Sequence, residues 1–194
     1  MLNTFLIALA LAGKPDVGEP TAISPEVAQG RYEQLRGEME RLASRNAWGG
    51  VEDAWVEMAG LGVEIPVNLR MLGADSARIR GDAWSAYQRL ADVLRLATPE
   101  EAEANGVAGQ MQIYRDGWGR VTVRRMEATP IALGIVAFPL MPEGRAAVDF
   151  ATKQLKTTGG FDGLLPVGDY TVGPYPFAVT ASLEPVVIQR VIGD

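Results

Sequence analysis

Residues 160–172 read Gly-Phe-Asp-Gly-Leu-Leu-Pro-Val-Gly-Asp-Tyr-Thr-Val. Pro166 and Gly168 favour a tight turn, and the apolar residues before and after it favour strands. We expect Tyr170 to pack its ring inward where the second of these strands begins. The segment therefore predicts that the C-terminal part of the chain consists of strands joined by short turns.

The sequence around this segment also has the pattern of strands, with one interruption. Residues 118–125 alternate with a period of two, which predicts a half-buried strand. The apolar run 131–138 predicts a core strand, and residues 175–179 and 186–192 supply two more. Apolar residues between 146 and 156 have helical spacing instead, so we expect one helix to be inserted among the strands.

The sequence Gly-Phe followed by Leu-Pro-x-Gly-x-Tyr-x-Val resembles the end of carboxypeptidase-regulatory-like and PEGA-type domains. The resemblance implies a transthyretin-like, antiparallel β-sandwich over residues 117–194, from which the inserted helix is a departure. Domains of this family are usually non-catalytic and act as spacers, stabilisers or contact surfaces on exported proteins. The resemblance therefore implies a similar role here.

The preceding residues, 24–115, have the period of amphipathic helices. Ser24 and Pro25 have the residue types of a helix start, and apolar residues then recur at spacings of three and four. This spacing predicts four helices with one apolar face each. The faces are Ala28, Tyr32, Leu35, Met39 and Leu42 on the first helix; Val51, Ala54, Trp55, Met58 and Leu61 on the second; Leu69, Leu72 and Ile79 on the third; and Trp84, Tyr87, Leu90, Ala91 and Leu94 on the fourth. Residues 98–101, Thr-Pro-Glu-Glu, mark the start of the last helix, which we expect to continue toward Tyr114.

The triplet Asp-Ala-Trp occurs at residues 53–55 and again at 82–84. A recurring triplet on antiparallel helix pairs resembles tetratricopeptide-type (TPR) repeats, although a simple helical bundle would also fit. The sequence thus predicts an α+β, multidomain chain. Its parts are a TPR-like helical array over residues 24–115 and a small β-sandwich over residues 117–194.

The N-terminus has the features of an export signal. Residues 2–12 are mostly apolar and end in Ala-Leu-Ala, the small-x-small form that precedes a signal-peptidase cut. We therefore expect a signal peptide over residues 1–12, a linker over 13–23, and a periplasmic or secreted protein. The segment is short and lacks a basic residue before the apolar run, so a buried N-terminal helix or strand is the alternative. The sequence has no apolar run long enough for a membrane span.

Composition excludes several kinds of chemistry. The chain contains no Cys and no His, which excludes disulfides, Ser-His-Asp triads and metal sites built on thiolate or imidazole ligands. Phosphate-binding Gly-rich motifs and the nucleophile elbow are also absent. We therefore assign no catalytic, cofactor-binding or metal-binding residue and expect a protein that is not an enzyme.

The formal net charge of −6 is unevenly distributed. Residues 1–116 contain 11 basic and 17 acidic side chains, whereas residues 117–194 contain 7 of each. An acidic surface repels phosphate groups, so nucleic acid is not an expected partner.

Acidic residues cluster near the Pro-Gly turn. Asp162 and Asp169 flank it, with Glu143 and Asp149 upstream. Paired carboxylates could serve a glycosidase, and their oxygens could hold Ca²⁺. Because Asp is common in turns for backbone reasons, we interpret Asp162 and Asp169 as solvated turn residues.

The aromatic residues that could be exposed are Trp48, beside a pair of glycines, Trp118, at the junction of the two halves, and Tyr175. We predict an exported, non-catalytic interaction or scaffold protein of the bacterial cell envelope, which binds a protein partner through its helical half. The alternative is a glycan-binding module or weak glycan-acting enzyme that uses these aromatics and the turn carboxylates. The sequence leaves the partner and the oligomeric state open.

Overall fold

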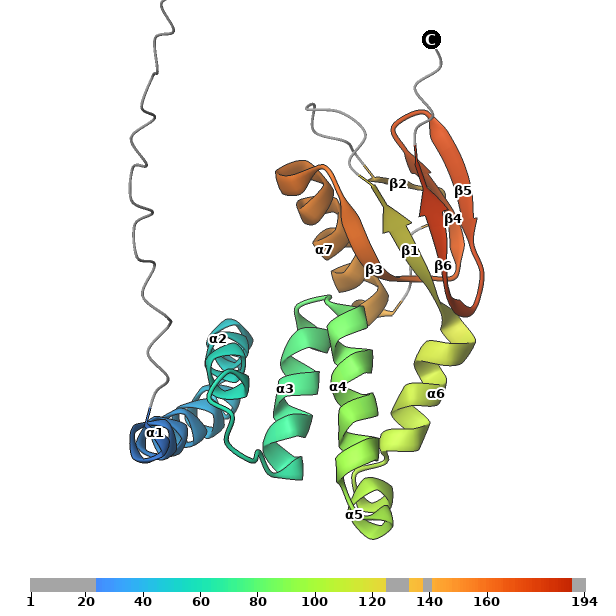
Figure 1. Cartoon of the computed structure of the whole chain (residues 1–194). Helices are drawn as coiled ribbons and strands as arrows, with labels where there is room; N and C mark the ends of the chain where they lie inside the picture. Colours follow the sequence, from blue (N-terminus) through green and yellow to red (C-terminus); the bar gives the residue numbers. More distant parts are fainter. Residues whose placement is uncertain (1–23, 125–132, 138–140, 190–194) are drawn as a thin grey trace, which may run out of the picture.

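The computed structural model describes residues 24–124, 133–137 and 141–189, and it is an α+β protein. Helices occupy one end of the molecule, and the strands, with one helix beside them, occupy the other (Figure 1). The expected signal peptide and linker and parts of the apolar run 131–138 lie outside the described residues. The helices are α1 (Pro25–Ala43), α2 (Trp48–Ala59), α3 (Val67–Ile79), α4 (Ala83–Leu96), α5 (Pro99–Ala104), α6 (Val107–Gly117) and α7 (Pro142–Thr158). The strands are β1 (Trp118–Val123), β2 (Leu133–Ile135), β3 (Phe161–Pro166), β4 (Gly168–Val172), β5 (Tyr175–Val179) and β6 (Ser182–Ile188).

The predicted helix starts are confirmed. The Ser24 hydroxyl accepts a hydrogen bond from the Val27 N–H at 3.4 Å, and Pro25 occupies the first turn of α1. Thr98 and Glu101 form a reciprocal capping box at α5. The predicted last helix is in fact two helices, because Gly106 adopts a left-handed φ of 62° between α5 and α6.

The apolar faces of α1 and α2 are also confirmed, whereas those of α3 and α4 differ in part from expectation. The expected face of α4 included Leu94, which is 46% exposed, because Val93 points into the core in its place. Ile79, at the end of α3, is exposed as well. Periodicity locates a helix, but the elements packed around it decide which edge of the apolar stripe is covered.

The two Asp-Ala-Trp triplets are not equivalent in the structure. Asp82 caps α4 by accepting a hydrogen bond from the Ser85 N–H at 3.0 Å, whereas Asp53 lies inside α2 and is exposed. Trp55 is buried, while Trp84 is half-buried. The triplet therefore marks two different positions along a helix.

A half-buried polar network joins α2, α3 and α4. The guanidinium of Arg89 donates from both terminal nitrogens to the Glu52 carboxylate, each at 2.6 Å, and lies over the Trp55 ring at 5.3 Å. The Ser76 hydroxyl donates to the same carboxylate at 2.7 Å. Burial by itself would raise the pKa of Glu52, but the hydrogen bonds from Arg89 and Ser76 hold it below its ordinary value. The carboxylate is thus the ionised partner that fixes three helices to one another.

The strands form two three-stranded sheets, with orders β3-β1-β6 and β2-β4-β5. All pairs are antiparallel except β1 and β6, which run parallel, so the expectation of a wholly antiparallel arrangement does not hold for this pair. The predicted turn at residues 166–168 carries the chain from β3 in one sheet to β4 in the other. Tyr170 packs inward as expected, and its hydroxyl donates to the carbonyl oxygen of Pro166 at 2.8 Å.

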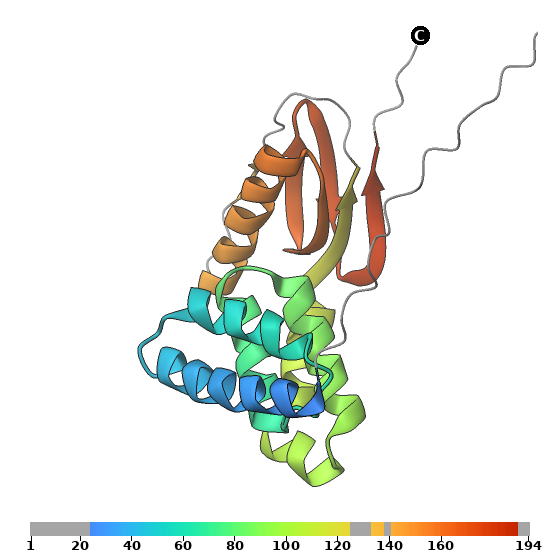
Figure 2. The ribbon, with the colours of Figure 1, turned by 60° about the vertical axis from the view of Figure 1, so that its left-hand side comes forward.

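The inserted helix is confirmed as α7, and its predicted apolar stripe is buried. It runs along one side of the strands (Figure 2) and shares a core cluster with residues from both sheets. A second cluster joins the helices to the strands, because Ala147 of α7, Trp118 of β1 and Leu164 of β3 pack with α3, α4 and α6. In the ranges that the structure describes, no helix is long and apolar enough to cross a membrane.

Candidate functional site

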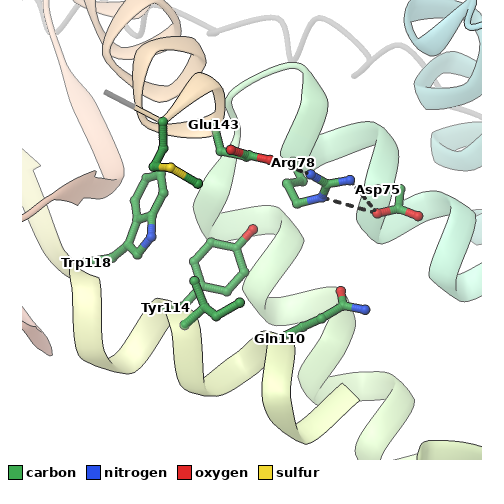
Figure 3. A pocket seen from close by; sticks show the side chains of 8 residues that line it. Asp75, Arg78, Gln110, Tyr114, Trp118 and Glu143 are labelled. Carbon is green, nitrogen blue, oxygen red and sulfur yellow. Dashed lines mark hydrogen bonds and ion pairs between the residues drawn. The ribbon is translucent and has the colours of Figure 1, made fainter. Parts of the chain in front are cut away.

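A hollow with a volume of about 300 Å³ lies where the helices meet α7 and β1. Four elements line it, and Figure 3 draws the lining side chains: Asp75 and Arg78 from α3, Gln110, Ile113 and Tyr114 from α6, Trp118 from β1, and Met141 and Glu143 from the start of α7. The site therefore depends on how the helical part and the β part meet.

Arg78 is held between two carboxylates on one wall of the hollow. Its Nε and Nη2 donate to Asp75 Oδ1 at 3.2 and 3.0 Å, and its Nη1 donates to Glu143 Oε1 at 3.1 Å. Asp75 lies one turn before Arg78 on α3, which is the helix spacing at which side chains meet. Glu143 lies in the first turn of α7, where an acidic side chain is favoured by the helix dipole.

The opposite wall is aromatic. The rings of Tyr114 and Trp118 are 5.5 Å apart and tilted by 55°, since these residues lie on either side of the point where α6 runs directly into β1. Tyr87 of α4 packs edge-on to Tyr114 at 6.0 Å. The two rings of this wall are therefore held rigidly by the core behind them.

The mouth of the hollow is apolar. Ile113 is 66% exposed and Met141 is 67% exposed, and both line the hollow. Each is a large apolar side chain that is mostly open to water. Such side chains around a concave, aromatic surface are typical of a binding site.

The side chains that line the hollow determine what chemistry it can carry out. Burial raises the pKa of Tyr114 to about 12, so its hydroxyl stays protonated and is a poor base or nucleophile at neutral pH. Arg78 is engaged by its two carboxylates. Among the residues in the described ranges, no group of three acidic side chains is placed to hold a metal ion.

The three aromatics proposed from the sequence lie in different parts of the structure. Trp118 lines the hollow but is only 8% exposed, so it offers a ring edge and not an open face. Trp48 is half-buried against the α1–α3 core, and Tyr175, at 44% exposed, belongs to β5. The glycan hypothesis relied on Trp118 and Tyr175 together, and the burial of Trp118 weakens it.

The acids near the turn are also separated. Asp162, on β3, accepts hydrogen bonds from Arg120 at 3.1 Å and from Thr122 at 2.9 Å. Partial burial would raise the pKa of Asp162, but these bonds hold it below its ordinary value. Asp169 lies on β4 in the other sheet, and Glu143 lines the hollow. The interpretation of Asp162 as a turn residue is wrong, since it lies within β3 and pairs with Arg120, although its side chain is half exposed.

Sequence reasoning missed most of the hollow. Asp75, Arg78 and Gln110 were not singled out, because each has an ordinary place on the polar side of an amphipathic helix. Among the signals that could have found it, the Pro-Glu pair at 142–143 marks the start of α7, and the spacing of Tyr114 and Trp118 places two aromatics at the helix–strand junction.

Comparison with known proteins adds no assignment to this geometry. No protein-family model, no curated protein and no solved structure matches the chain. The function is therefore argued from the chain's own residues.

Proposed function

We propose that this is a non-catalytic interaction protein that binds a protein partner through its helical half, with the hollow between α3, α6 and α7 as the anchor site. The observation that carries the proposal is the pair of exposed apolar side chains, Ile113 and Met141, at the mouth of an aromatic-walled hollow. Binding energy at protein interfaces is concentrated where a side chain of one partner fills a pocket of the other. The hollow has the size and the lining for such an anchor.

The experiment uses a photoreactive benzoylphenylalanine in place of Met141, in cells that make the protein naturally. We expect one specific adduct with a second protein. The adduct should be lost when Ile113→Asp is added, because a charge at the mouth opposes burial of an apolar anchor. Val27→Asp is the matched control, since Val27 is a similar apolar side chain, 62% exposed, on α1. An adduct that survives Ile113→Asp, or the absence of any adduct, would refute the proposal.

The finer fold within this proposal is a TPR-like array followed by a transthyretin-like β-sandwich. Successive helices pack on their neighbours, α1 on α2, α2 on α3 and α3 on α4, which supports an array. The non-equivalence of the two Asp-Ala-Trp triplets weighs against a strict sequence repeat. The core shared by the two sheets supports a sandwich.

The place of action in the proposal is the cell envelope. Its support is the apolar run that ends in Ala10-Leu11-Ala12. Intact-mass measurement on fractionated cells tests it. A periplasmic product that begins near Gly13 is the expected result, and an uncut chain in the cytosol would contradict it.

A further inference from the structure

We propose that the hollow recognises a positively charged group on an aliphatic stem, so that the partner's anchor is a lysine or arginine side chain. This inference rests on the proposed function, because it names the chemistry of the group that the same site takes. It follows from three features of the hollow: unused carboxylate oxygens, an apolar passage leading to them, and aromatic walls.

The carboxylates of Asp75 and Glu143 each have unused capacity as hydrogen-bond acceptors. Arg78 bonds to one oxygen of each, Asp75 Oδ1 and Glu143 Oε1. The other two oxygens accept no hydrogen bond from any residue in the described ranges. Both side chains are partly exposed, at 34% and 38%, and both line the hollow. A carboxylate accepts several hydrogen bonds, and an ammonium or guanidinium donates several.

The charge of the lining favours a cation. Two carboxylates face one guanidinium, which leaves one negative charge uncompensated. A net negative charge among the lining side chains attracts a positive group.

The rest of the hollow suits an aliphatic stem. Ile113 and Met141 form the mouth, and the rings of Tyr114 and Trp118 form the inner wall. Lysine and arginine side chains bury their methylene groups on apolar surfaces while the charged end remains in a polar place. The arrangement leads from an apolar mouth to an acidic end, which matches a side chain that changes from apolar to charged along its length.

The test uses three probes that share a butyl group and carry a positive, a neutral and a negative head group: n-butylammonium, n-butanol and pentanoate. Each is titrated into the full chain at constant ionic strength, and binding is followed by the NMR resonance of the Trp118 indole N–H. We expect saturable binding of butylammonium, tighter than that of the other two probes. In Glu143→Gln, butylammonium should bind roughly fivefold more weakly, the effect of losing one partly exposed ion pair. Glu40→Gln, which removes an exposed acid on α1, should leave its affinity unchanged.

Each other outcome overturns the inference. Equal binding of butanol and butylammonium would show that the hollow selects apolar surface only. Tighter binding of pentanoate would show that Arg78 directs an anion there. No shift with any probe would show that the hollow takes no alkyl cation. The result is independent of the cross-linking experiment: an adduct that depends on Ile113 without butylammonium binding refutes only the chemistry, and the converse refutes only the partner.

Discussion

A substitution at Gly81 tests the contact between α3 and α7, on which the candidate site depends. It lies between α3 and α4 with a left-handed φ of +88°. A β-carbon at this position would overlap the carbonyl oxygen of Ala146 in α7 and lie 2.9 Å from the Ala147 nitrogen. The obstacle is backbone, which cannot rotate away. Gly81 therefore lets the end of α3 approach α7, and this approach brings Arg78 within reach of Glu143.

A matched control separates the conformational and the steric contributions to the destabilisation by Gly81→Ala. Gly106 also has a left-handed φ, of +62°, but a β-carbon there would meet nothing within 4 Å. Gly106→Ala should destabilise the fold by about 1–2 kcal/mol, the conformational term alone. Gly81→Ala adds the steric conflict with α7, about 1–3 kcal/mol for overpacking, so we expect about 2–5 kcal/mol in total.

Urea unfolding followed by circular dichroism measures both free energies. Hydrogen exchange of the α7 amides adds a local readout, which should change in Gly81→Ala and stay unchanged in Gly106→Ala. Equal destabilisation by the two substitutions, with α7 exchange unaltered, would refute the argument that close packing of residue 81 positions α7.

Two further predictions concern ionisable groups. Glu52→Gln should destabilise the fold by about 2–4 kcal/mol, because it leaves the half-buried Arg89 without its anion. Replacing both partners with apolar residues, Glu52→Leu with Arg89→Met, should destabilise the fold less than Glu52→Gln alone. Urea unfolding measures both free energies. Since folding lowers the pKa of Glu52, ionised Glu52 stabilises the fold above its ordinary pKa of 4.5, and this stabilisation is lost as the pH falls below 4.5. The stability of Glu52→Gln should therefore decrease less steeply below pH 4.5 than that of the unaltered protein. Burial raises the pKa values of Tyr114 and Tyr170 to about 12, so the stabilisation from both is present below pH 10 and is lost as the pH rises toward 12. Ultraviolet titration of tyrosinate should therefore show late-titrating groups, with one fewer in Tyr170→Phe than in the unaltered protein.

Local patterns predicted the elements of this fold well. The stripe Ala147, Val148, Ala151 and Leu155 is buried as its spacing indicates, because a helix of that composition has only one apolar face to cover. The same holds for the caps of α1 and α5, whose hydrogen bonds join residues three apart. Such features need only nearby residues, so a sequence contains what is required to predict them.

Contacts between segments that are far apart in the sequence were harder to predict. The parallel pairing of β1 with β6 joins residues 119–123 to 182–188, and no turn between them indicates the direction. Val93 replaces Leu94 in the core for the same reason, since neighbouring elements choose the covered edge of the stripe. The hollow draws on residues near 75, 114 and 142, each unremarkable in its own segment. Its charge balance exists only after these three segments have packed together.

The position of the hollow has a consequence for how the two parts of the molecule behave. α6 passes into β1 without a loop, so Tyr114 and Trp118 are fixed to both parts at once. Arg78 and Glu143 bridge the same junction from α3 to α7. A ligand seated among these four side chains touches both parts and binds only while they are joined. By linkage it must then stabilise their contact, by a free energy that grows with the logarithm of the ligand concentration above the dissociation constant. Partner binding at this site and the rigidity of the junction are therefore two aspects of one equilibrium.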